Sequence, residues 1–158
     1  MRGYELVFFG GSMIVAFCGH SSYVPALGDK DILLGILEKL SEGDIAELLL
    51  GENGGFDDFA FECSREFCLR HPGSRLIFVT PYLRESKRPA GSYDQIIYPE
   101  LENVPQRFAI CHRNRKMVNM ADAVIACVKH CYGGAYATYK YAIAKGKKVF
   151  NIAQVSRL

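Results

Sequence analysis

Short apolar runs alternate along this chain with segments of helical periodicity. The apolar runs cover residues 13–20, 46–50, 75–83, 123–128 and 148–153. Strands that read as continuous apolar runs are typical of a parallel sheet covered on both faces. Helical segments between such strands supply right-handed crossovers, and this rule leaves few possible topologies. The alternation therefore predicts an α/β domain with a mostly parallel sheet of about five strands.

Four segments between the apolar runs carry the signals of helices. The expected helices begin at Asp29, at Gly54-Gly55, at Pro105 and at Gly133-Gly134, and they end near Leu40, His71, Met120 and Lys145. Polar capping residues, glycine and proline are typical of such boundaries. Residues 84–104 are polar and lack clear periodicity, which predicts a long loop of the kind that often covers a binding site. Residues 13–158 thus read as one three-layer, Rossmann-like α/β domain with no linker.

Residues 1–12 stand outside this pattern, because the first clean strand begins at Met13. Gly10-Gly11-Ser12 can be encoded by a purine-rich stretch that resembles a ribosome-binding site. Residues 1–12 are therefore expected to be a translated leader with Met13 as the biological start, or else a flexible tail or an extra strand.

The bulk composition sets limits on partners and on location. The formal net charge is +2, and the basic residues look scattered apart from Lys145, Lys147 and Lys148 at the end of the last expected helix. On this basis we do not expect a nucleic-acid partner. No apolar run approaches the roughly 20 residues that span a bilayer, so no membrane partner is expected. Cysteines inside apolar runs, such as Cys18 and Cys127, indicate free thiols in a reducing, cytoplasmic compartment.

The sequence also gives no sign of a metal site or a resident cofactor. Cysteine and histidine gather around Cys18, Cys111 and Cys127, but no C-x-x-C pair occurs. A structural zinc site usually needs four converging ligands with such a pair. We therefore expect neither a metal nor a cofactor.

The carboxyl edge of the sheet is the expected place for a ligand. Parallel α/β sheets bind ligands beyond the carboxyl ends of their strands, near the point where strand order reverses. Gly19-His20 lie at this edge, and so do the two glycine pairs. Glycine lets a backbone approach a phosphate, and the unpaired amides of a helix start favour an anion. We expect both pairs to face one cavity, with phosphate at Gly133-Gly134 and the hydroxyl of Thr138 nearby.

Two further groups carry candidate chemistry, each with an alternative. Asp57 and Asp58 lie at the start of an expected helix. Three roles are open for them: offsetting the helix dipole, contacting a ribose, or acting as a catalytic carboxylate beside a glycosidic bond, for which Glu52 is also a candidate. Arg113-Asn114 lies in the middle of a helix. An arginine there needs an anion or solvent, so a ligand contact and a solvated face are equally open.

The motifs NGGFD, RNRKM and GGAYAT, in this order, resemble those of the SLOG superfamily, which contains the DNA-processing protein DprA and the LOG phosphoribohydrolases. The chain is most similar to the small YpsA-like bacterial proteins of that group. The resemblance covers nearly everything from Met13. It implies a nucleotide-type pocket lined by nine residues: Gly19, Gly54, Gly55, Asp57, Arg113, Asn114, Gly133, Gly134 and Thr138.

The chain departs from the LOG pattern at a catalytic position. LOG enzymes follow their glycine pair with a glutamate that acts at the ribosyl bond, whereas residues 135–140 here contain no acid. The leading expectation is therefore a sensor that binds a nucleotide or a nucleotide derivative with little or no catalysis. A homodimer is compatible with this expectation. An N-glycosidic hydrolase that uses Glu52, Asp57 or Asp58 is the alternative, and single-stranded DNA binding ranks third, because the sequence shows no obvious basic groove.

Overall fold

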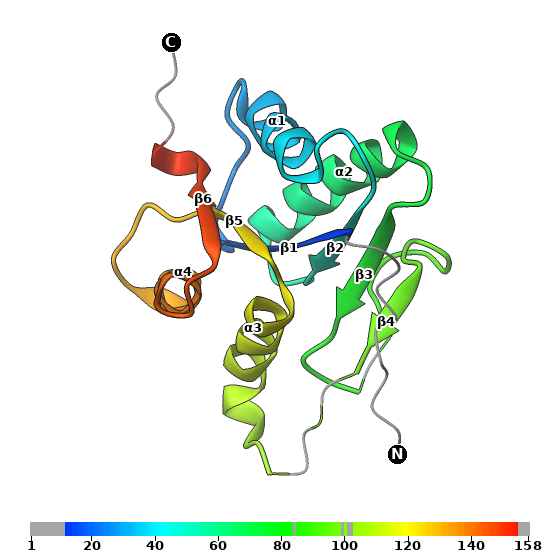
Figure 1. Ribbon diagram of the computed structural model, residues 1–158. Helices are drawn as coiled ribbons and strands as arrows, with labels where there is room; N and C mark the ends of the chain where they lie inside the picture. Colours follow the sequence, from blue (N-terminus) through cyan, green and yellow to red (C-terminus); the bar gives the residue numbers. More distant parts are fainter. Residues whose placement is uncertain (1–11, 84, 99, 101–102, 155–158) are drawn as a thin grey trace.

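The computed structural model describes residues 12–83, 85–98, 100 and 103–154, and it contains one six-stranded, fully parallel sheet (Figure 1). The strands lie in the order β4-β3-β2-β1-β5-β6. Their bounds are β1 (Met13–Gly19), β2 (Ala46–Leu50), β3 (Arg75–Val79), β4 (Gln95–Ile97), β5 (Ala123–Cys127) and β6 (Lys148–Asn151). The helices are α1 (Asp29–Ser41), α2 (Gly55–Arg70), α3 (Ala109–Met120) and α4 (Gly133–Ala144).

The chain reverses direction across the sheet at β1. From β1 to β4 the strands are added outward on one side, and α3 then carries the chain back to β5, which pairs with the other side of β1. In doubly wound sheets this reversal point is where ligands bind.

Helices cover both faces of the sheet, which makes three layers (Figure 1). The alternating side chains of β1 show the division: Val15 and Phe17 pack in one core with α1 and α2. Ile14, Ala16 and Cys18 pack in the other core with α3 and α4. Because successive strand residues point to opposite faces, a buried strand must be apolar throughout. The predicted three-layer, Rossmann-like fold is confirmed.

The sheet has one strand more than predicted, because β4 lies inside residues 84–104, which we expected to be a loop. All three β4 residues are half-buried, so they form no buried apolar run that would signal a strand. Pairing with Ile77–Val79 holds β4 in place. Next to it, the side chain of Asp94 accepts a hydrogen bond from the Leu76 amide at 2.8 Å.

Two predicted element boundaries were also wrong. β3 ends at Val79, not at Leu83, because the chain turns after Thr80, whose hydroxyl donates to the Tyr82 carbonyl at 2.7 Å. The third helix begins as a 3₁₀ turn, η1 (Gln106–Phe108), before α3 starts at Ala109. Of residues 1–12 the structure describes only Ser12, so the predictions for that segment lie outside the described residues. Within the described part of the chain, no helix is both long enough and apolar enough to cross a membrane.

Candidate functional site

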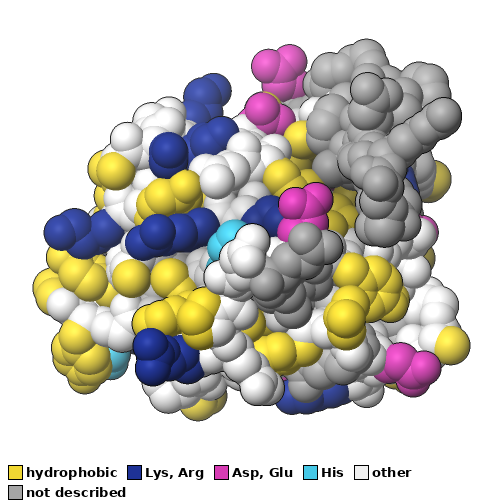
Figure 2. Space-filling model, turned by 90° about the horizontal axis from the view of Figure 1, so that it is seen from below, with side chains coloured by type: hydrophobic (Ala, Val, Ile, Leu, Met, Phe, Trp, Pro, Cys, Tyr) yellow, Lys and Arg dark blue, Asp and Glu magenta, His cyan; other side chains and the backbone are white. Residues whose placement is uncertain are grey.

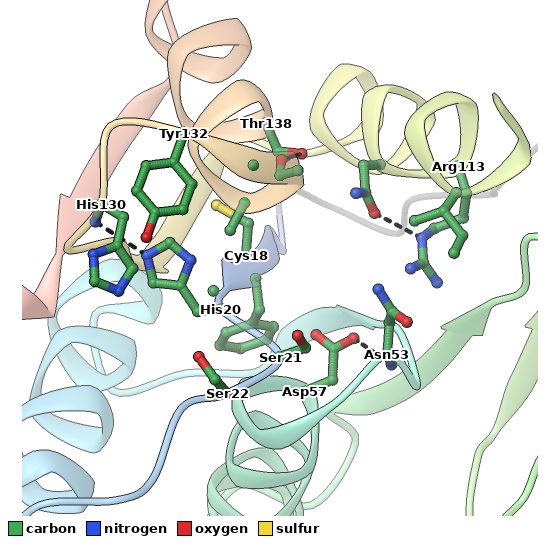
Figure 3. Close-up of a pocket in the computed structure, with 17 residues that line it drawn as sticks. Cys18, His20, Ser21, Ser22, Asn53, Asp57, Arg113, His130, Tyr132 and Thr138 are labelled. Carbon is green, nitrogen blue, oxygen red and sulfur yellow. Dashed lines mark hydrogen bonds between the residues drawn. The ribbon is translucent and has the colours of Figure 1, made fainter. Parts of the chain in front are cut away.

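A cavity of about 310 Å³ lies at the carboxyl edge of β1, at the reversal point of the sheet (Figure 3). Its walls come from the segment after β1, the start of α2, the first turns of α3, and the loop and helix start after β5. The lining residues are Phe17, Cys18, Gly19, His20, Ser21, Ser22, Asn53, Asp57, Ile110, Arg113, Asn114, His130, Tyr132, Gly133, Gly134, Ala135 and Thr138. A cavity of this size lies at the lower end of the range for small-molecule sites.

The start of α4 opens into this cavity. No described side chain caps the helix, so the first-turn amides are available to a ligand. A Cβ added to Gly133 or Gly134 would find no neighbouring atom within 4 Å. Gly133 has a φ of 86°, which favours glycine. The hydroxyl of Thr138 donates to the Gly134 carbonyl at 2.9 Å. Gly133, Gly134 and Thr138 thus line a space with the character of an anion site.

The other glycine pair does not line the cavity. The Gly55 amide donates to the Ser21 carbonyl at 2.8 Å, and a Cβ on Gly54 would stand 2.5 Å from the Ser21 Cα. A Cβ on Gly55 would overlap the Tyr23 carbonyl oxygen. The pair is needed because the loop after β1 packs directly on the start of α2. The structure therefore brings only one of the two glycine pairs to the cavity.

His20 lies at one end of the cavity, where its ring contacts the loop after β5 (Figure 3). Its Nε2 accepts hydrogen bonds from the amides of Lys129, at 3.0 Å, and His130, at 3.3 Å. This acceptor role requires a neutral ring with its proton on Nδ1. Burial lowers the pKa of His20, and His130 and Lys129 lower it further. His20 is thus a neutral acceptor next to the α4 start.

An aromatic stack continues from His20. The His130 ring lies 4.8 Å from the His20 ring, and Tyr132 stacks on His130 at 5.2 Å with an interplanar angle of 16°. His130 and Tyr132 are both exposed. Planar rings at the mouth of a cavity offer a surface on which a planar ligand ring can stack. The sequence analysis did not select these two residues, since exposed aromatics in a loop have no periodic signal.

Arg113 lies at the opposite end and is almost fully buried, with 2% of its surface exposed. It donates from Nη1 to the Val79 carbonyl at 2.9 Å and from Nε to the Asn114 side-chain oxygen at 2.8 Å. The solvated-face interpretation of Arg113 is therefore wrong. Arg113 and Asn114 both line the cavity, and a buried guanidinium there provides positive charge for an anionic ligand.

Asp57 faces Arg113 across the cavity wall (Figure 3). Its Oδ2 accepts a hydrogen bond from the Asn53 amide at 2.7 Å. Burial raises the pKa of Asp57, although the Arg113 guanidinium and the Asn53 amide act in the opposite direction. Gly51 makes room for both groups: a Cβ there would stand 2.7 Å from Arg113 Nη1 and 2.9 Å from Asp57 Oδ2. The sequence analysis missed Gly51, because a single glycine after a strand is common.

The structure places Glu52 and Asp58 away from the cavity. Glu52 accepts hydrogen bonds from the Ser86 hydroxyl, the Lys87 amide at 2.8 Å and the Tyr93 hydroxyl at 2.9 Å. Burial alone raises the pKa of Glu52, but these hydrogen bonds together hold it below the usual value. Asp58 pairs with Arg88 at 3.0 Å. Both acids hold the segment after β3. Gly19 does line the cavity, and a Cβ there would overlap the Phe56 ring.

Comparisons with known proteins identify the fold. No protein-family model matches the chain, and no curated protein has a similar sequence. DNA processing protein A from Helicobacter pylori, described as binding single-stranded DNA, is 21% identical and covers 92% of this chain with a TM-score of 0.62. Its relative from Streptococcus pneumoniae is 19% identical over 89% of this chain, with a TM-score of 0.66.

The molybdenum cofactor carrier protein from Chlamydomonas reinhardtii is 16% identical over 88% of this chain and 75% of its own, with a TM-score of 0.54. The chain spans 66% of the length of the Helicobacter protein and 50% of the Streptococcus protein. Identities this low establish the fold alone. The protein therefore has a DprA-like Rossmann fold.

Proposed function

We propose that this protein binds a nucleotide or a nucleotide derivative in the cavity at the carboxyl edge of β1 and acts as a sensor of that ligand. The observation that carries the proposal is the open, uncapped start of α4 in a cavity that a buried arginine also lines, at the reversal point of the sheet. The amides of a helix start and a guanidinium are complementary to a phosphate. A fold neighbour named as a carrier of the molybdenum cofactor supports a small-molecule role.

The cavity suggests an orientation for the ligand. The phosphate would lie on the amides of residues 133–135, at the helix start that no described side chain caps. The planar base would stack on the ring of Tyr132, which is 71% exposed. The ribose, which connects phosphate and base, would lie in the middle of the cavity, where Asn114 and Asp57 on the facing walls form hydrogen bonds with its hydroxyls. This arrangement leaves the structural Gly54-Gly55 pair out.

A thermal-shift screen tests this function. We would measure Tm with the four nucleoside monophosphates, adenosine and inorganic phosphate. A ligand at 100 times its Kd stabilises the folded state by about 2.7 kcal/mol. For a chain of this size, that stabilisation raises Tm by roughly 5–11 °C. At least one nucleotide should reach this range while adenosine does not. If no nucleotide shifts Tm, the proposal fails.

Two variants of nearly equal shape link any shift to the α4 start. Gly134→Glu places a carboxylate at the proposed phosphate site, and Gly134→Gln places a neutral amide of the same size there. Space is open at this position, so both variants should fold. We expect Gly134→Glu to weaken nucleotide binding at least tenfold more than Gly134→Gln does. Equal losses would show that the anion lies elsewhere.

The alternative function, cleavage of an N-glycosidic bond, rests on Asp57 and its raised pKa. Glycoside hydrolysis normally uses a pair of carboxylates. Asp57 is the one acidic side chain among the described residues that line the cavity, so we favour binding over catalysis. Incubation of nucleoside monophosphates with the protein, followed by chromatography for free base, separates the two functions. Release that Asp57→Asn abolishes would establish the enzyme.

Three finer predictions remain proposals of this account. They are the kinship with YpsA-like proteins, a cytoplasmic location and a homodimer, and sedimentation analysis tests the last of these. The expectation that nucleic acid is not a partner gains no support, because a fold neighbour is described as binding single-stranded DNA.

A further inference from the structure

Charge is strongly segregated along this sequence, which the overall value of +2 conceals. Residues 103–158 contain ten Lys and Arg residues and one acid, Asp122, and so carry a net charge of +9. Residues 1–102 contain nine Lys and Arg residues and sixteen acids, and so carry −7. Asymmetry of this size between two parts of a chain indicates a surface for an anionic partner.

The fold turns this segregation into a difference between two faces. Helices α3 and α4 pack together as one outer layer, and neither contains an Asp or Glu. On the opposite layer charges are paired: Lys30 and Arg70 both contact Glu66, at 3.1 and 3.6 Å. Figure 2 views the molecule from the α3–α4 side. In its left part, Lys and Arg side chains lie among hydrophobic ones with no Asp or Glu between them.

Cations and aromatic rings alternate at the seam between the two helices. Arg115 lies over the Tyr141 ring at 5.2 Å, and Lys145 lies over the same ring at 5.5 Å. Lys140 lies over the Tyr136 ring at 5.6 Å. The Tyr141 hydroxyl donates to the Asn119 side chain at 2.8 Å, which fixes the ring between α3 and α4. We call these six residues (Arg115, Asn119, Tyr136, Lys140, Tyr141, Lys145) the basic seam.

We propose that the basic seam binds single-stranded nucleic acid, with phosphates on Arg115, Lys140 and Lys145 and unpaired bases on the rings of Tyr136 and Tyr141. Arg115, Lys140 and Lys145 are exposed, and the Tyr136 and Tyr141 rings beside them are half-buried. Clustered cations beside aromatic rings are the pattern by which proteins hold single strands without sequence readout. A duplex hides its base faces, so it gains nothing from the two rings. None of the six seam residues lines the cavity, so the proposal does not depend on the cavity's ligand.

Fluorescence anisotropy with labelled 20-mers tests the proposal. The probes are oligo-dT and oligo-rU, a 20-base-pair DNA duplex, and polyglutamate as a competitor, each in a NaCl series. Both single strands should bind more tightly than the duplex, and the difference between dT and rU reports which strand is preferred. Affinity should fall linearly with salt on a double-logarithmic plot. The proposal is overturned if single strands do not bind, if the duplex binds equally well, or if polyglutamate competes as strongly as unlabelled dT.

Matched variants locate the site. A triple variant, Arg115→Gln, Lys140→Gln and Lys145→Gln, removes three cations from the seam, and each neutralised phosphate of a single strand contributes about 0.7 to the salt slope. The slope should therefore fall by about 2. The control, Lys30→Gln, Lys39→Gln and Arg65→Gln, removes the same charge from the opposite layer and should leave the slope unchanged. Equal effects of the two triples would refute binding at the seam.

The tyrosine contribution is measured separately, because charge alone does not select single strands. Stacking of one base on one ring changes affinity roughly 5- to 150-fold. We expect Tyr136→Leu and Tyr141→Leu each to weaken single-strand binding within this range while duplex binding stays the same. Thermal unfolding of each variant reports whether the fold is retained, and Tyr136→Leu provides the test if Tyr141→Leu unfolds. Unchanged single-strand affinity in folded variants would contradict the proposed stacking.

Discussion

Alanine substitutions at three glycines separate the two roles that paired glycines play in this fold. At Gly54 an added methyl group stands 2.5 Å from the Ser21 Cα, where carbon atoms normally keep about 3.5–4.0 Å, and φ is 110°. At Gly133 the φ of 86° is strained for alanine but the space is open. At Gly134 neither obstacle is present.

The magnitudes follow from these differences. Overpacking costs about 1–3 kcal/mol, and a backbone conformation reserved for glycine costs about 1–3 kcal/mol more, so Gly54→Ala should lose about 2–6 kcal/mol of stability. Gly133→Ala bears only the strain and should lose about 1–2 kcal/mol. Gly134→Ala should be neutral or slightly stabilising, since alanine is the better helix former. On this scale Tm should fall by roughly 4–24 °C in Gly54→Ala and by roughly 2–8 °C in Gly133→Ala, and it should not fall in Gly134→Ala.

Urea and thermal unfolding, followed by circular dichroism, measure all three variants under one set of conditions. The order of stability should be Gly134→Ala, then Gly133→Ala, then Gly54→Ala. If Gly54→Ala is as stable as Gly134→Ala, the loop after β1 does not pack on the start of α2 as described. If Gly134→Ala is the least stable of the three variants, the start of α4 is not open as described.

Three further predictions concern single polar residues. Because the pKa of His20 is lowered in the folded protein, the unfolded chain takes up a proton at this residue at a higher pH than the folded chain does, and stability should fall as pH drops below about 6.5. In measurements of Tm against pH, His20→Asn should make this fall smaller. A pH profile identical to that of wild type would contradict the neutral-acceptor role. Glu52→Gln weakens the hydrogen bonds that hold residues 86–93, so limited proteolysis should cut there faster than in wild type; unchanged cutting would refute the anchoring role. Asn151→Ala leaves the Val128 amide and carbonyl without their side-chain partner and should lower the free energy of unfolding by about 2–4 kcal/mol. The control, Asn119→Ala at an exposed position, should lower it by less than about 1 kcal/mol. Equal losses would contradict this account.

Much of the fold was predictable because a buried parallel strand must be apolar on both faces. Three runs, at residues 13–20, 46–50 and 123–128, match strands closely for this reason. The run at residues 148–153 also contains a strand, β6, although only one of its four residues is buried. β4 escaped detection because it is three residues long and half-buried, and its place is set by tertiary pairing with β3. No local pattern encodes that pairing.

The site was predictable only as far as the edge of the sheet. Sheet topology places Gly19, His20, Asp57 and the α4 start together, since the carboxyl ends of parallel strands share one edge. It does not say whether a glycine faces a ligand or another loop, so Gly54-Gly55 was assigned to the cavity. Glu52 and Asp58 were likewise candidates by position, and only the segment that follows β3 shows that their oxygens are already used.

The charge pattern shows a different limit. The total of +2 led to the expectation that nucleic acid is not a partner, because averaging removes information on position. The basic residues are distributed over residues 103–158, and the packing of α3 on α4 brings Arg115 near Lys140 and Lys145.

Chemical-shift mapping of amide signals during a nucleotide titration tests the central claim most directly. If the ligand's phosphate lies on the uncapped start of α4, the amide signals of Gly133, Gly134 and Ala135 should move most, together with the Arg113 side chain. The Gly54 and Gly55 amides should stay in place. Large shifts at Gly54 and Gly55 with none at residues 133–135 would contradict the account.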